Sequence, residues 1–450
     1  MSNTLPELCQ WFWDAEASMD LLQQQEQGVF WWGLIRSPLQ HILMEHTGLF
    51  GAPHPLLKDT PVRNAKKLGR LMKDCLLRNP FLQSRRYEYI VMPHTRQRGG
   101  VDIYSDAILS HLPHSQTLVL YERATGQHYP HSKTMALALL HNAFFARNKR
   151  LSSPTIMVIR ALEQSITENF GLTLNMQQMV KKAITRFCVL QRYYQRLFTR
   201  AQARHLYVVV AYRHCAAIAA AQQSGMVVTE LQHGIFTPYH LGYSYPIQPE
   251  HAPYQPQHIA CFGAFYPETT PLSPKIKWHV SGAAYMATPE ITAIKSNKQP
   301  DSIIFASQAA IANELWQFAV ETARLLPNKH CVFHPHPSED LRSYRHLTSD
   351  KFPGNLHLAN TNTATLQAMA QSEVVVGVSS TSLLEALALG CKVMVVKLPG
   401  HEYMQPVIDK RDAFLVATAE EFCAALAHAT PCNTPEYYFA DTTTEPIPIT

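Results

Sequence analysis

Polar and imidazole side chains follow a short apolar run at residues 227–231. The chain continues with Gln232, His233 and Gly234, and Glu230 stands three positions before the histidine. Because open α/β proteins bind ligands beyond the carboxyl ends of their strands, polar residues in this position indicate a site. An imidazole exposed by a glycine turn, with a carboxylate to orient it, has the parts of a general base. We therefore predict His233 as a catalytic base and Glu230 as its orienting partner; the alternative is a structural histidine that satisfies loop carbonyls.

Four further polar residues are candidates for substrate contact on the same side of the site as His233. Gln232, His240 and Tyr243 belong to the same motif, and Arg96 belongs to a basic loop at residues 94–100. For Arg96 the alternative is a solvated surface loop.

Two histidines alternate with prolines directly after an apolar run at residues 330–333. Each proline holds the preceding residue in an extended backbone, so His334 and His336 are expected to stay in the loop. A His-x-His pair could bind zinc, but no third and fourth ligand follow at a suitable spacing. We predict contact with a phosphate and no metal site; an ordinary turn is the alternative.

Four hydroxyl residues, at positions 379–382, separate another apolar run from a helical stretch. Their hydroxyl groups, the backbone N–H groups and the positive end of a helix suit an anion. Glu385, one turn further on, could accept hydrogen bonds from a ribose. The alternative is a helix cap in which Ser382 and Glu385 form a capping box. The predicted anion and nucleotide contacts at this edge are Ser379, Ser380, Thr381 and Glu385, together with Ser307 and Gln308, which end a strand facing the same cleft.

The elements that would position these residues are clearest in the second half of the chain. Short β-branched runs alternate there with amphipathic stretches of helical length, which predicts right-handed crossovers and a parallel, doubly wound sheet. The first half holds similar strands and a long helical region. We predict an α/β fold of two Rossmann-like domains that face a cleft: residues 1–284 with a helical insertion at 153–204, a linker at 285–300, a second domain at 301–430 and a tail at 431–450. The tail either crosses back onto the first domain or is disordered.

Composition narrows the class of protein. The 450 residues are 46% hydrophobic and 16% charged, which excludes extensive disorder, and a net charge of +5 does not indicate nucleic-acid binding. Nine cysteines without a C-x-x-C pair favour reduced thiols, and no secretory signal or apolar span of membrane-crossing length is present, so we predict a cytoplasmic location. A peripheral contact with the inner membrane face is allowed, through a basic stretch at Lys66, Lys67 and Arg70.

Taken together, these motifs resemble those of GT-B glycosyltransferases of bacterial capsule and lipopolysaccharide assembly, a group that includes polysialyltransferases and CDP-glycerol glycerophosphotransferases. The resemblance covers the second domain and residues 230–243, through His233-Gly234, His336-Pro337 and Ser379-Ser380. It extends only loosely to the first 80 residues, through Trp32-Gly-Leu-Ile-Arg36. It implies a base at His233 and donor-phosphate contacts from His336, Ser379 and Ser380. Related chains often carry a lysine two places before the histidine of the His-Pro pair. His334 stands there instead, so the resemblance does not supply a permanent positive charge at the phosphate.

The resemblance implies metal-independent transfer of a sugar from a nucleotide-sugar donor to a cell-surface polysaccharide or lipid-linked glycan. No cofactor is expected, since no Asp-x-Asp stands at a strand end. Two alternatives stay open. One is transfer of a polyol phosphate from a CDP-linked donor, and the other is a catalytically silent protein that binds a nucleotide or glycan.

Overall fold

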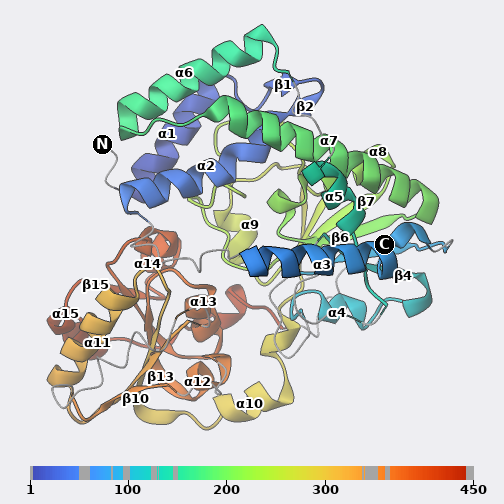
Figure 1. Cartoon of the computed structure of the whole chain (residues 1–450). Coiled ribbons are helices and arrows are strands. Elements are labelled where there is room, and N and C mark those ends of the chain that lie inside the picture. The colour runs from blue at the N-terminus through green and yellow to red at the C-terminus, as the bar shows by residue number, and fades with distance from the viewer. Residues whose placement is uncertain are drawn as a thin grey trace.

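Two parallel sheets, each packed with helices, form an N-terminal and a C-terminal domain (Figure 1). The computed structural model describes residues 4–49, 61–82, 85–94, 102–122, 129, 131–144, 150–336, 339, 353–359 and 365–441. Within these residues every strand of the two large sheets pairs with its neighbours in parallel. The predicted fold class, two doubly wound α/β domains, is confirmed.

The sheet of the N-terminal domain has seven strands in the order β5-β4-β3-β6-β7-β8-β9. The chain enters at β3, moves outward to β5, and then returns to β6 on the other side of β3. This reversal places a topological switch point between β3 and β6, where doubly wound sheets bind ligands. The strands are β3 (Tyr89–Met92), β4 (Thr117–Tyr121), β5 (Lys133–Thr134), β6 (His205–Val209), β7 (Val227–Leu231), β8 (His258–Cys261) and β9 (Lys277–Val280).

The sheet of the C-terminal domain has six strands in the corresponding order, β12-β11-β10-β13-β14-β15, so its switch point lies between β10 and β13. Its strands are β10 (Gln299–Ala306), β11 (His330–His334), β12 (Leu356–Leu358), β13 (Ser372–Gly377), β14 (Lys392–Val396) and β15 (Phe414–Val416). Its helices are α10 (Pro289–Lys295), α11 (Ala312–Leu325), α12 (Thr365–Gln371), α13 (Thr381–Ala388), α14 (Gln405–Asp409) and α15 (Ala419–Leu426).

Four long helices gather on the N-terminal domain, at the top of Figure 1. The predicted insertion at 153–204 is confirmed as the pair α6 (Ser153–Phe170) and α7 (Met176–Ala201). Gly171, with φ +65°, ends α6, and the Asn175 side chain caps α7 by accepting from the Gln178 N–H at 2.9 Å. Two helices that the sequence analysis did not foresee, α1 (Leu5–Ser18) and α2 (Trp31–Thr47), complete this group.

The remaining helices and strands of the N-terminal domain are short, except α3, which has 17 residues. They are β1 (Gln25–Glu26), β2 (Val29–Phe30), α3 (Pro61–Leu77), α4 (Asp106–Leu109), α5 (Ala136–Phe144), α8 (Cys215–Gln223) and α9 (Phe265–Thr269).

The predicted linker at 285–300 is largely folded into the C-terminal domain. It contains α10 and the first residues of β10, and the Gln367 side chain of α12 donates to Glu290 of α10 at 2.6 Å. Strand β10 begins at Gln299, which pairs with Ser372 of β13, and its register shifts between Gln299 and Ile303, where Asp301 has φ +63°.

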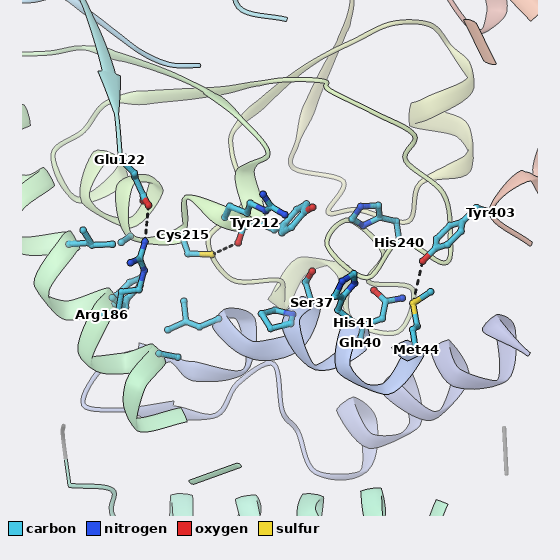
Figure 2. Close-up of a pocket in the computed structure, with 17 residues that line it drawn as sticks. Ser37, Gln40, His41, Met44, Glu122, Arg186, Tyr212, Cys215, His240 and Tyr403 are labelled. Carbon is cyan, nitrogen blue, oxygen red and sulfur yellow. Dashed lines mark hydrogen bonds and ion pairs between the residues drawn. The ribbon is translucent and has the colours of Figure 1, made fainter. Parts of the chain in front are cut away.

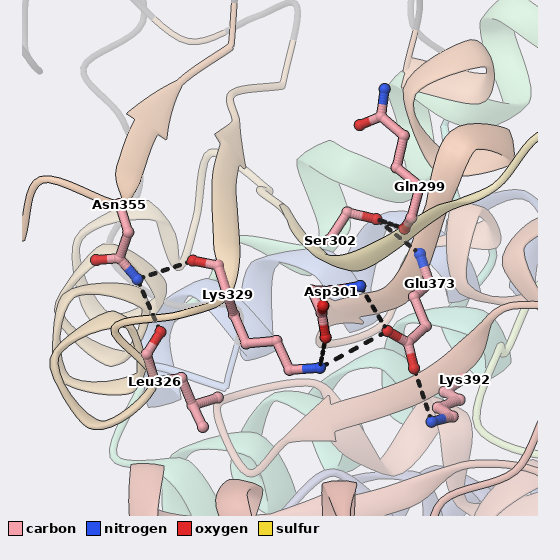
Figure 3. Close-up of polar contacts among 8 residues, drawn as sticks. All are labelled: Gln299, Asp301, Ser302, Leu326, Lys329, Asn355, Glu373 and Lys392. Atoms are coloured by element: carbon pink, nitrogen blue, oxygen red, sulfur yellow. Dashed lines mark hydrogen bonds and ion pairs between the residues drawn. The ribbon is translucent and has the colours of Figure 1, made fainter.

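A charged network closes the amino edge of the C-terminal sheet (Figure 3). Lys329 approaches Asp301 at 2.5 Å and Glu373 at 3.8 Å, and Lys392 approaches Glu373 at 2.8 Å. Asn355 donates to the carbonyl of Lys329 at 2.9 Å and so holds the turn before β11. These residues begin the strands, so the network lies at the end of the sheet opposite the predicted site.

The C-terminal tail returns to the N-terminal domain. Tyr438 is fully buried, the Phe439 ring stacks on Phe262 with centroids 5.0 Å apart, and the Ala440 N–H donates to the Phe262 carbonyl at 2.7 Å. Of the two fates predicted for residues 431–450, crossing back is therefore confirmed for 431–441, while 442–450 lie outside the described residues. No helix in the described part of the chain is long and apolar enough to span a bilayer.

Candidate functional site

The predicted residues of the C-terminal domain meet at its switch point. Ser307 and Gln308 follow β10, and Ser379 follows β13. The side-chain oxygen Oε1 of Gln308 accepts from the Ser379 N–H at 3.1 Å, and the side-chain nitrogen Nε2 of Gln308 lies 3.4 Å from the Ser379 hydroxyl. A side chain from one half of the sheet thus bridges to the other half directly above the reversal of strand order, where such sheets bind ligands.

Both predicted histidines of this domain lie at the same edge. The Ser307 N–H donates to the His334 carbonyl at 3.0 Å, which places the end of β11 beside the end of β10. His334 is only 7% exposed, and its ring nitrogen Nδ1 lies 3.4 Å from the Thr365 hydroxyl. His336 is half-buried, and its N–H donates to the Glu339 carboxylate at 2.9 Å. Of the two rings, His336 is the better placed to meet a ligand.

Helix α13 directs its amino end to this edge. Its N-cap is Ser380, whose side chain accepts from the Ser382 N–H at 3.2 Å, and Thr381 is the first helical residue. The capping box of Ser382 and Glu385 is therefore not the cap that forms. Glu385 is 7% exposed and accepts from the Tyr285 hydroxyl at 2.8 Å. That contact crosses from the segment between the domains to the helix.

The loop after β14 contributes a residue that the sequence analysis missed. Gly400 has φ +93°, and a Cβ built there would lie 3.2 Å from the Ser379 hydroxyl. The backbone of this loop thus approaches the switch point closely because the residue has no side chain. A Pro-Gly pair three residues after a buried strand was the signal that could have revealed it.

On the opposite side, His233 lies at the carboxyl edge of the N-terminal sheet. Its ring stacks on His94 with centroids 5.9 Å apart and meets the edge of Tyr104 at 6.4 Å. His94 follows β3, and its N–H donates to the buried carboxylate of Asp102 at 2.9 Å. His94 and Tyr104 were not predicted, since neither belongs to a recognisable motif. Arg96, which was predicted, lies outside the described residues.

The predicted pairing of Glu230 with His233 is not formed. Glu230 is fully buried, and its carboxylate accepts from the Tyr243 hydroxyl and from the Ala211 N–H at 3.0 Å. Burial raises the pKa of Glu230 to about 7, although these hydrogen bonds act in the opposite direction. Tyr243 and the backbone of Ala211 hold the Glu230 carboxylate, whereas His233 lies beyond the end of β7 at Leu231.

Two of the four residues predicted to contact substrate on the His233 side, Gln232 and Tyr243, instead stabilise the local structure. Gln232 is 1% exposed; its amide donates to the Gly234 carbonyl at 2.7 Å and its oxygen accepts from the Phe262 N–H at 2.8 Å. Tyr243 is 2% exposed, and its ring stacks on Phe236 at 3.8 Å. Both side chains hold the loop that carries His233 and leave no polar atom facing a substrate.

The two carboxyl edges meet. A Cβ on Gly234, the residue after His233, would lie 3.4 Å from the Thr381 hydroxyl at the start of α13. Beside this contact, Tyr104 meets the ring of Tyr285 at 6.1 Å, and Tyr285 in turn reaches Glu385. The residue after the predicted base and the first residue of α13 therefore lie side by side where the two domains meet.

A cavity of about 690 Å³ lies in the N-terminal domain, and Tyr403 of the C-terminal domain also lines it (Figure 2). Helices α2 and α7 supply an apolar wall that includes Leu34, Met44 and Phe187. Arg186, also of α7, lies 2.8 Å from Glu122 at one end of the cavity. Tyr403 reaches in from the C-terminal domain, and its hydroxyl lies 3.7 Å from the Met44 sulfur. Its size is that of a site for a small organic molecule.

His240, the remaining acceptor-side prediction, lines this cavity. Burial lowers the pKa of His240 to about 4, so the ring is neutral at physiological pH. Its Nδ1 accepts from the Gly242 N–H at 3.1 Å, which fixes the proton on Nε2. The ring of Tyr243 separates it from His233, with centroid distances of 5.0 Å to His240 and 6.3 Å to His233.

Among the described residues, no group of three or more His, Cys, Asp or Glu side chains is arranged to hold a metal ion.

Comparison with known proteins found no matching family model and no matching curated protein. Comparison with solved structures finds distant similarities. A glycosyltransferase of Phytolacca americana, UGT2, complexed with UDP-2-fluoro-glucose and pterostilbene, is 10% identical and covers 80% of this chain and 92% of its own, with a TM-score of 0.43. MurG of Acinetobacter baumannii is 12% identical over 76% of this chain and 90% of its own, with a TM-score of 0.42. The UDP-GlcNAc 2-epimerase of Methanocaldococcus jannaschii, in complex with UDP-GlcNAc and UDP, is 11% identical over 79% and 96%, with a TM-score of 0.44. Transferases and epimerases both occur among these structures, so they do not decide an activity.

Proposed function

We propose that the protein transfers a glycosyl group from a nucleotide-sugar donor to a hydroxyl group of a glycan or lipid-linked glycan. The observation that carries the proposal is the close approach of Gly234, the residue after His233, to Thr381 at the amino end of α13. We place the reaction crevice at this junction of the two domains. A transfer reaction needs a base on the acceptor side and stabilisation of negative charge on the donor side. Each domain offers one of these.

The C-terminal domain would hold the donor. The N–H groups at the start of α13 and the Ser380 hydroxyl suit the diphosphate, and the half-buried His336 lies at the same edge. As the bond between the anomeric carbon and phosphate breaks, these groups would stabilise the departing nucleotide. Glu385, held by Tyr285, is available to the ribose.

The N-terminal domain would present the acceptor. His233 would take the proton of the acceptor hydroxyl while its oxygen bonds to the anomeric carbon. His94 and Tyr104 orient the ring of His233, in place of the predicted Glu230. The cavity beneath Tyr403, with its apolar wall and the neutral His240, would take a part of the acceptor remote from the reacting hydroxyl.

Nucleotide binding tests the donor site. The protein is heated with CMP, CDP, UDP, GDP or dTDP, and a nucleotide at 100 times its Kd should add about 2.7 kcal/mol of stability, seen as a raised Tm. Ser380→Ala and His336→Ala should abolish the shift, whereas the matched controls Ser296→Ala and His251→Ala, both remote from the crevice, should keep it. If none of the nucleotides stabilises the protein, the donor site is refuted.

Turnover tests the chemistry. His233→Ala should keep the nucleotide-dependent rise in Tm and lose release of nucleotide from the corresponding nucleotide-sugar. Release from a CDP-linked polyol but not from nucleotide-sugars would replace the proposal with polyol-phosphate transfer. Binding without any turnover by the unaltered protein would leave a nucleotide-binding role only.

A further inference from the structure

Helix α3 carries an exposed apolar stripe. Leu68, Met72 and Leu76 are 44%, 50% and 71% exposed, and their spacing of four residues puts them on one face of the helix. Leu77 and Leu82, 64% and 66% exposed, extend this apolar surface past the end of the helix. Single exposed hydrophobic residues are ordinary, but half of the large ones that the described chain exposes gather on this short segment.

The helix is attached to the domain along a different side. Leu71 packs against the main core, and the Arg78 carbonyl just after the helix accepts from the Thr134 N–H of β5 at 2.9 Å. The helix therefore has a fixed place in the fold, and the stripe is not a core face left without its partner.

The charge of the segment complements an anionic surface. Residues 61–86 contain eight basic side chains and one acidic side chain, Asp74, which lies 3.8 Å from Arg78. Arg70 and Lys73 in the helix are exposed, as are Arg85 and Arg86 beyond it. An apolar stripe beside exposed cations is the pattern of helices that lie in a membrane interface and bind anionic lipid.

We propose that α3 docks the protein onto the surface of an anionic lipid bilayer. Leu68, Met72 and Leu76 would enter the boundary between headgroups and acyl chains, and Arg70 and Lys73 would meet lipid phosphates. A second copy of this chain is a poorer occupant, since it would bring two strongly positive segments together. The proposal does not depend on the reaction proposed above.

The test is co-sedimentation with lipid vesicles. The full chain should bind vesicles that contain phosphatidylglycerol in phosphatidylcholine, bind pure phosphatidylcholine far more weakly, and be released by salt. The variant L68S/M72S/L76S should lose the binding. The variant R70Q/K73Q should bind the anionic vesicles roughly thirty-fold more weakly, equivalent to about 1 kcal/mol for each cation.

A matched control removes the same number of exposed apolar side chains elsewhere. M157S/I247S/L325S takes away side chains that are 71%, 47% and 46% exposed on other parts of the surface, and it should bind like the unaltered protein. All variants should keep their Tm, because the substituted side chains are exposed. Absence of binding to anionic vesicles would overturn the proposal, as would equal loss in the control variant. A dimer in solution that only the α3 variant abolishes, without vesicle binding, would assign the stripe to self-association instead.

Discussion

At the scale of single residues, burial determines what each carboxylate does. Glu230 and Glu373 are both strand residues with hydrogen-bonded carboxylates, yet their pKa values move in opposite directions. For Glu230, burial prevails and the pKa rises to about 7. For Glu373, burial also acts to raise the pKa, but Lys392, the Asp301 N–H and Lys329 prevail and the pKa falls below 4.5. Ionised Glu230 therefore destabilises the folded protein, whereas ionised Glu373 stabilises it.

We expect Glu230→Gln to stabilise the protein at neutral and alkaline pH. The folded pKa is above the unfolded one, so the unaltered protein loses stability as pH rises from 4.5 to about 7, and the full cost persists above that. The glutamine retains an acceptor for Tyr243 and carries no charge. The gain should be absent near pH 4 and reach about 2–4 kcal/mol by pH 8, measured by urea unfolding across this range.

Glu373→Gln serves as the comparison and should behave in the opposite way. Its folded pKa is below 4.5, so the stability that it contributes is present above pH 4.5 and disappears as pH falls through the folded value. The substitution should therefore destabilise at pH 7 and have little effect at strongly acidic pH. The same pH dependence in both variants would contradict the assignment of causes.

At the scale of elements, a buried ion pair attaches the N-terminal helices to the loop after β7. Arg36 of α2 is 1% exposed and donates to Glu16 of α1 at 3.0 Å and to the Ser244 carbonyl at 2.7 Å. The Arg36 guanidinium also donates to the Leu241 carbonyl and lies 4.1 Å above the ring of Tyr245. Helices that the sequence analysis overlooked thus fix the segment that carries His240.

We expect Arg36→Leu to lower the free energy of unfolding by about 3–5 kcal/mol, because it leaves the Glu16 carboxylate buried without its cation. The double variant Glu16→Leu/Arg36→Leu should lose less than the single one, since no unpaired charge remains. Urea unfolding of the unaltered protein, of Arg36→Leu, of Glu16→Leu and of the double variant measures this. A double variant as unstable as the sum of its parts would show that the pair is not coupled.

The C-terminal tail that crosses to the N-terminal domain packs closely against Gly263. A Cβ on Gly263 would lie 2.3 Å from the Tyr437 carbonyl, a distance that forces the backbone of the tail to move. Gly263→Ala should therefore displace the tail, cost about 2 kcal/mol or more, and expose residues 435–441 to protease. Gly69→Ala, where a Cβ would meet nothing within 4 Å, should be neutral or stabilising. Resistance of the tail to protease in the Gly263 variant would refute the argument.

At the scale of the whole molecule, function depends on how closely the two carboxyl edges approach. Gly234→Phe would insert a phenyl ring between the domains. Even a Cβ at this position would lie 3.4 Å from the Thr381 hydroxyl, so the ring has no room unless the domains move apart. We expect turnover to fall at least a hundred-fold while nucleotide affinity, which rests on the C-terminal domain, changes only a few-fold. Gly234→Ala makes an ordinary contact and should retain activity. Equal loss of affinity and turnover would show that the wedge distorts the donor site itself.

The sequence by itself determined the local features of this protein. Apolar runs and their spacing are properties of neighbouring residues, so they predicted parallel strands, the helical insertion and the residues at both carboxyl edges. Ser307, Gln308, His336 and Ser379 were placed together because parallel strands end at one edge of a sheet. The same reasoning failed for Glu230, since its buried carboxylate is held by Tyr243 and Ala211, which are 13 and 19 positions away in the chain.

Only the tertiary structure decided which distant residues meet. His94, Tyr104, Tyr285 and Gly400 stand in no motif and reach the crevice through sheet order and domain packing. The choice between Ser380 and Ser382 as the cap of α13 also depended on this packing, because Glu385 is engaged by Tyr285 rather than by its own helix end. Long-range contacts of this kind depend on the relative positions of strands that are far apart in the chain, which local periodicity does not specify.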